Sequence, residues 1–173
     1  MRRKTIVITS ALAFSLLLSG CGAGQNAATR MVTRVTDGNE ITIRENGSEI
    51  RVVNLTLVDT QDGAAVVVAT IINQGAESDQ LLGFSVQGVQ AALSGETVLL
   101  PNKPLFFEGE QANAKAVFLG ANPKPGTHVT ISIGFAKAGF VTAEVIIRDK
   151  RDDFKNVISG AELVTVDTAT VTE

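Results

Sequence analysis

Val129-Thr130-Ile131-Ser132-Ile133-Gly134-Phe135 alternates large apolar residues with small or polar ones. This alternation is typical of a β-strand with one buried face, because successive side chains of a strand point to opposite faces. Gly139 then turns the chain into a second β-prone run, residues 140–147. The two runs predict a β-hairpin, and they indicate the fold class of the whole domain.

Other short runs of β-branched and apolar residues extend this pattern towards the amino terminus. Ile50–Val58 and Ala64–Ile72 flank the turn sequence Thr60-Gln61-Asp62-Gly63 and predict another hairpin. Further strands are expected at residues 80–86, 89–93, 97–100, 105–107 and 113–119. Short strands separated by turn-forming clusters predict an all-β sandwich.

The leader of the chain carries a targeting signal. Met1-Arg2-Arg3-Lys4 is basic, and the largely apolar residues 5–18 that follow are fewer than the roughly 20 needed to span a membrane. Ser19-Gly20-Cys21 then matches a bacterial lipobox around the only cysteine. We therefore expect residues 1–20 to be a lipoprotein signal peptide. We also expect acylation of Cys21 to hold the protein on the outer, extracytoplasmic face of the cell membrane.

The mature chain is predicted to be one domain with two flexible ends. Residues 21–39 are small and polar and are expected to form a tether, residues 40–160 the β-sandwich, and residues 161–173 a flexible C-terminal tail. Removing the signal peptide changes the formal net charge from −3 to −6, because it takes away three basic residues and no acidic one. An acidic chain without a basic cluster argues against nucleic acid as a partner.

Few residues of the mature chain could hold a metal. Residues 32–127 contain no His, Met or Cys, and His128 is the only histidine. A copper or zinc site needs several convergent ligands, so we expect neither a metal site nor a cofactor. Asp149, Asp152 and Asp153 lie among basic residues and lack the spacing of an EF-hand, so they are interpreted as a solvated strand end.

The sequence shows no catalytic motif, and we expect no enzymatic activity. Gly83-Phe84-Ser85-Val86-Gln87-Gly88 matches a nucleophile elbow only in part, since the second glycine comes one residue late and no helix is expected after it. Ser85 is interpreted as a strand residue and His128 as a surface residue. Without Trp or Tyr, an aromatic cage is not expected either. Core packing is the favoured role of the strand phenylalanines, and an apolar ligand pocket between the sheets is the alternative: Phe84, Phe106, Phe107, Phe118, Phe135 and Phe140.

Four segments in this order resemble the periplasmic copper chaperone family known as PCu(A)C: Ile72-Asn73-Gln74-Gly75, Asp79-Gln80-Leu81-Leu82-Gly83, Asn122-Pro123-Lys124-Pro125-Gly126 and Phe135-Ala136-Lys137-Ala138-Gly139. The leader is also similar to that of the actinobacterial LpqE-type lipoproteins in this family. The resemblance covers residues 50–148 and implies a cupredoxin-like, immunoglobulin-like β-sandwich. In the family, two His and two Met bind a copper ion that is supplied for cytochrome oxidase assembly.

The family's copper ligands are absent from the positions where the resemblance implies them. The first His would fall near Leu93, the first Met after Glu96, and the His-x-Met pair near Lys115 and Val117. We therefore carry over the fold and the location but not the metal. The sequence favours a membrane-anchored, non-enzymatic binding or accessory module for an envelope protein or an apolar ligand. The alternative is a copper-homeostasis protein with unusual ligands, such as His128 with carboxylates or a second chain.

Overall fold

The computed structural model describes residues 38–160. The predicted signal peptide, Cys21, the tether up to residue 37 and the tail 161–173 lie outside the described residues. Between residues 38 and 160, no helix is long and apolar enough to cross a membrane.

The described part of the chain is all-β, as predicted. Its strands are β1 (Asn39–Ile43), β2 (Ile50–Asp59), β3 (Ala65–Asn73), β4 (Asp79–Val86), β5 (Val89–Gln90), β6 (Ala92–Gly95), β7 (Val98–Leu99), β8 (Leu105–Phe106), β9 (Ala114–Phe118), β10 (His128–Phe135) and β11 (Gly139–Asp149). A single turn of 3-10 helix, η1 (Asp152–Phe154), follows β11.

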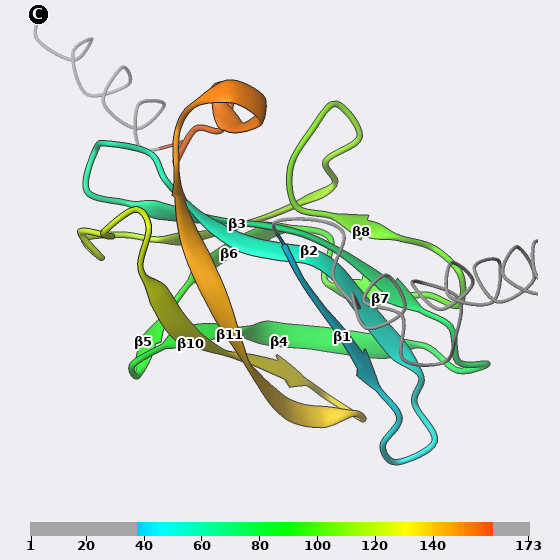
Figure 1. Ribbon diagram of the computed structural model, residues 1–173. Helices are drawn as coiled ribbons and strands as arrows, with labels where there is room; N and C mark the ends of the chain where they lie inside the picture. Colours follow the sequence, from blue (N-terminus) through cyan, green and yellow to red (C-terminus); the bar gives the residue numbers. More distant parts are fainter. Residues whose placement is uncertain (1–37, 161–173) are drawn as a thin grey trace, which may run out of the picture. The chain divides into compact units, whose positions relative to one another are not determined.

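The strands form a mixed sheet that folds over into two layers, one containing β2 and β3 and the other β4 and β10 (Figure 1). The hydrogen-bonded order is β5-β4-β10-β11-β2-β3-β9-β6. β11 joins the layers on one side, because it pairs with β10 along its length and with β2, in parallel, at its end. On the other side β5 pairs with β4 and β6 pairs with β9, so residues 89–95 also join both layers.

One edge of β2 serves two neighbours. Its first half pairs with β1 and its last residues pair with β11. A β-bulge lies at the changeover, where Asn54 has a φ of 56° and the Thr56 hydroxyl donates to the Ile146 carbonyl oxygen at 2.8 Å. Bulges bend and twist a strand, which allows β2 to follow first one neighbour and then the other.

The core lies between the two layers. In β10, the alternation predicted from the sequence buries Ile131, Ile133 and Phe135. Phe84 and Phe107 meet edge to face with their ring centroids 5.2 Å apart, an arrangement that adds to the stabilisation from burial. The prediction of core packing is wrong for Phe140, which is 79% exposed. Its partner in the β10–β11 ladder is Gly134, on the outer face of the sheet.

Two details of the strands differ from the prediction. β1 was not predicted, and it begins one residue before the expected start of the domain. Residues 89–93 were expected to form one strand, but Ala91 separates β5 from β6, where the chain leaves β4 and joins β9.

Candidate functional site

The positions where the resemblance implied copper ligands lie on two neighbouring strands. Leu93 of β6 is paired with Ala116 of β9, so Lys115 and Val117 flank its partner. Leu93 and Ala116 pack in the main core, whereas Lys115 and Val117 point to the other face because side chains alternate along a strand. Side chains at these three positions therefore do not converge on one point.

Residues at or beside the implied copper positions have ordinary structural roles. The ammonium group of Lys115 lies 3.3 Å from the Glu108 carboxylate, and Val117 packs in a second cluster with Val58. Glu96 is ion-paired with Lys103 at 3.1 Å. Across residues 38–160, no three His, Cys, Asp or Glu side chains gather into a group that could hold a metal ion.

Ser85 lies in a strand and His128 lies at the surface, as interpreted from the sequence. The two residues also lie apart. Ser85 lies inside β4 and is paired with Ser132 of β10. His128 is exposed and is the first residue of β10. Four residues of strand separate it from Ser132, roughly 13 Å at the usual rise per residue. His128 is therefore too far from Ser85 to act as its base.

The acidic residues near the end of β11 belong to no group of three potential metal ligands within residues 38–160. Asp149 is the last residue of β11, which runs two residues past the predicted end at residue 147, and Arg151 forms an ion pair with it. Hydrogen bonding to Arg151 lowers the pKa of Asp149. Asp152 and Asp153 lie in η1 and are exposed to solvent.

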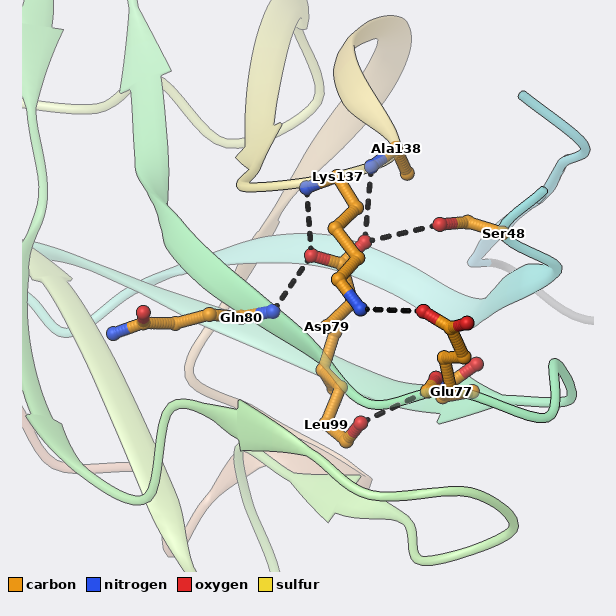
Figure 2. A network of polar contacts seen from close by, with 8 residues as sticks. Ser48, Glu77, Asp79, Gln80, Leu99, Lys137 and Ala138 are labelled. Atoms are coloured by element: carbon orange, nitrogen blue, oxygen red, sulfur yellow. Dashed lines mark hydrogen bonds and ion pairs between the residues drawn. The ribbon is translucent and has the colours of Figure 1, made fainter. Parts of the chain in front are cut away.

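Asp79 is 5% exposed, and its carboxylate accepts four hydrogen bonds within the described part of the chain (Figure 2). One oxygen accepts hydrogen bonds from the backbone N–H groups of Gln80 at 2.7 Å and Lys137 at 2.8 Å. The other accepts the N–H of Ala138 at 2.9 Å and the hydroxyl of Ser48 at 3.3 Å. Asp79 therefore holds together the start of β4, the β10–β11 turn and the β1–β2 loop.

These donors decide the charge state of Asp79. Burial alone raises its pKa, but the backbone N–H groups of Lys137, Gln80 and Ala138, with the Ser48 hydroxyl, outweigh burial. The pKa of Asp79 is therefore lower than its ordinary value of 3.8. A carboxylate bonded in this way is a structural anion, since its lone pairs are already occupied by donors from its own chain.

Asn73, which is 1% exposed, has a similar role at the end of β3. Its side-chain amide donates to the carbonyl oxygens of Glu77 at 2.7 Å and Leu99 at 2.9 Å, and its oxygen accepts the N–H of Gly75 at 3.0 Å. Glu77 is in turn ion-paired with Lys137 at 2.8 Å. Three of the four segments that carry the family resemblance thus meet in one structural network.

The remaining segment that carries the resemblance, residues 122–126, contributes to the lining of a pocket. This pocket, which we call the end pocket, has a volume of about 230 Å³ and opens at one end of the sandwich. Its deepest residues belong to the main core: Leu57, Ala65, Phe118 and Ile147. Further apolar contacts come from Val86, Val89, Ala121, Pro123 and Val129. The polar side chains that line it are those of Gln87, Asn122, Lys124 and Thr127.

The loop between β9 and β10 covers this pocket and is held at both of its ends. The Asn122 N–H donates to the Gly63 carbonyl oxygen at 3.1 Å, which ties the loop to the β2–β3 turn. At its other end, the Gly126 N–H donates to the carbonyl oxygen of Ile147 in β11 at 2.8 Å. The Ile147 N–H in turn donates to the carbonyl oxygen of Thr127 at 2.9 Å. The end pocket is therefore lined by a loop whose backbone is fixed by hydrogen bonds at both ends.

Comparisons with known proteins support the fold. The sequence matches no known protein-family model and no curated protein. Among solved structures, the apo PCuAC domain from PmoF1 is similar, with 22% identity and a TM-score of 0.54 over 64% of this chain and 99% of that one. The fold is PCuAC-like.

Two structures of another PCuAC domain, that of PmoF2, are also similar to this chain. The copper-bound form has 16% identity and a TM-score of 0.52, covering 64% of this chain and 98% of that one. The apo form has 15% identity and a TM-score of 0.53, covering 66% of this chain and 98% of that one. At these identities the likeness concerns the fold alone, and it confirms the predicted sandwich. The function of this PCuAC-like chain has to be inferred from its own residues.

Proposed function

We propose that this protein is a non-enzymatic binding module of the cell envelope that takes a small apolar ligand in the end pocket. The observation that carries the proposal is the composition of that pocket, whose mainly apolar lining includes buried core side chains such as Leu57 and Phe118 beside a fixed loop. Preformed pockets with mostly apolar linings and a few polar groups are the usual form of small-molecule sites.

The proposal includes the lipid anchor predicted at Cys21. It is supported by the lipobox and by the apolar stretch before it, both of which are features of the sequence. An anchored module of this kind would hold its ligand close to the outer face of the membrane. Substituting Cys21→Ser should release the protein from the membrane fraction, and retention of this variant would contradict the anchor.

Binding of a neutral apolar fluorophore, such as Nile red, tests the pocket. The chain contains no Trp or Tyr, so it adds little fluorescence of its own. Val89 lines the pocket and is 52% exposed, whereas Val98 lies outside it and is 51% exposed. Val89→Asp places a charge against the apolar ligand and should weaken its binding about tenfold. Val98→Asp should leave the binding unchanged. Equal effects of the two substitutions, or no binding at all, would reject the proposal.

Copper homeostasis is the second candidate, because the fold is similar to that of a copper-bound PCuAC domain. The described residues offer it little support. His128 is exposed, and no group of three potential ligands includes it anywhere in residues 38–160. Carboxylates are poor ligands for Cu(I), so we rank this function second.

A further inference from the structure

The end pocket has a charged group at only one point of its lining. Of the residues that line it, Lys124 alone is ionisable, and neither Asp nor Glu is among them. A ligand held there meets an apolar surface on most sides and one cation.

Lys124 is available to a ligand. Ion pairs join Lys103, Lys115 and Lys137 to carboxylates of the domain, but none within residues 38–160 involves Lys124. Its side chain is exposed, while hydrogen bonds from Thr127 to its carbonyl oxygen fix its backbone. An anion beside the pocket would therefore gain a partner without breaking an existing ion pair.

The size of the pocket limits the apolar part of the ligand. The end pocket has a volume of about 230 Å³, below the roughly 300–1,000 Å³ of sites that enclose drug-sized ligands. We therefore expect it to take one medium-length apolar chain rather than the two chains of a membrane lipid.

We propose that the end pocket binds the chain of a single-chain amphiphile whose anionic head, a carboxylate or a phosphate, pairs with Lys124. This inference rests on the proposed function and names the chemical class of the ligand. The apolar chain supplies affinity through its burial, and the head sets the direction of binding because the only charge lies at Lys124.

Chain length gives the first test, by calorimetric titration of the full chain carrying Cys21→Ser, which prevents acylation. Each buried methylene should strengthen binding about fourfold. Affinity should therefore rise from hexanoate to octanoate to decanoate and then level off at dodecanoate. An affinity that keeps rising with length beyond dodecanoate would indicate micelle-like association with the surface and would overturn the inference.

The head group gives the second test. Decanoate and decyl phosphate should bind more tightly than decan-1-ol, and the tighter of the two anions identifies the kind of head. Lys124→Glu should weaken both anions about tenfold and leave the alcohol unchanged. The matched control is Lys155→Glu, because Lys155 is also exposed and lies outside the pocket. Equal binding of decanoate and decan-1-ol, or an equal effect of the control, would overturn the inference.

These results separate this inference from the proposed function. If the alcohol and the fluorophore bind in competition but Lys124→Glu has no effect on the anions, the pocket binds apolar ligands and the assignment of an anionic head is wrong. If neither fluorophore nor amphiphile binds, the proposed function is itself wrong.

Discussion

Asp79 is a residue whose side chain holds separate segments of the described chain together. Its two oxygens accept four hydrogen bonds that come from three separate segments of the chain (Figure 2). Charge-assisted bonds of this kind are stronger than those between neutral groups. A single carboxylate therefore fixes the β10–β11 turn against the beginning of β4.

Substituting Asp79→Asn should destabilise the fold. The amide replaces one acceptor oxygen with a donor, which then faces the backbone N–H groups that donate to that oxygen in the wild type. We expect the free energy of unfolding to fall by about 1–3 kcal/mol in urea denaturation. Asp153→Asn is the control, because Asp153 is exposed, and it should change stability by less than about 0.5 kcal/mol. A loss of similar size in both variants would contradict this role for Asp79.

The same carboxylate makes stability depend on pH. Because the pKa of Asp79 is lower in the folded protein than its ordinary value of 3.8, the stabilisation is complete above that value and is lost as the pH falls through the lower, folded pKa. The difference in stability between wild type and Asp79→Asn should stay constant from about pH 7 to about pH 5 and narrow below about pH 4. Urea titrations across this range measure it, and a difference that does not narrow would contradict the pKa shift.

At the scale of the strands, local pattern predicted the long elements and missed features that only the pairing of strands reveals. β2, β3, β10 and β11 were all predicted, because each is a long β-prone run bounded by turn residues. β1 was missed because this short segment follows polar residues, and its main partner is β2. The exposure of Phe140 was missed for a related reason, since the pattern does not show that Gly134 lies opposite it.

Two strand glycines should respond differently to alanine. Gly95 of β6 has a φ of +83°, and an added Cβ would lie 2.4 Å from the Asn113 carbonyl oxygen. At Gly134 of β10 the added Cβ would lie 2.7 Å from Cε1 of Phe140, but that exposed ring can turn away. Gly95→Ala should cost more than about 2 kcal/mol of stability, and Gly134→Ala less than about 1 kcal/mol. Urea denaturation compares them, and the reverse order would contradict the packing described for β6 and β10.

At the scale of the whole molecule, the sequence predicted the fold class but not the candidate site. The β9–β10 loop was recognised as a segment rich in turn residues, yet the end pocket also needs residues from β2, β3, β4, β5, β9, β10 and β11. Side chains so far apart in sequence come together only when the two layers close. The sequence left open an apolar pocket between the sheets, but it did not predict the pocket's place or the presence of Lys124 in its lining.

The resemblance seen in the sequence has a structural meaning at this scale. Asn73, Asp79 and the Lys137-Ala138 turn hold loops and strands together, and the segment 122–126 fixes one end of the sandwich. These contacts have structural roles in the described part of the chain. The chain therefore has a PCuAC-like fold although the positions where the resemblance implied copper ligands hold no His or Met.

Calorimetric titration of the full chain carrying Cys21→Ser with Cu(I) and with Cu(II) tests this account most directly. His128→Ala serves as the control for binding at the only histidine of the chain. We expect no stoichiometric binding tighter than about 10 μM, an affinity of about −7 kcal/mol, and loss of any weak signal in the control. Stoichiometric binding with a submicromolar Kd would contradict the account and show that the chain binds copper through other ligands.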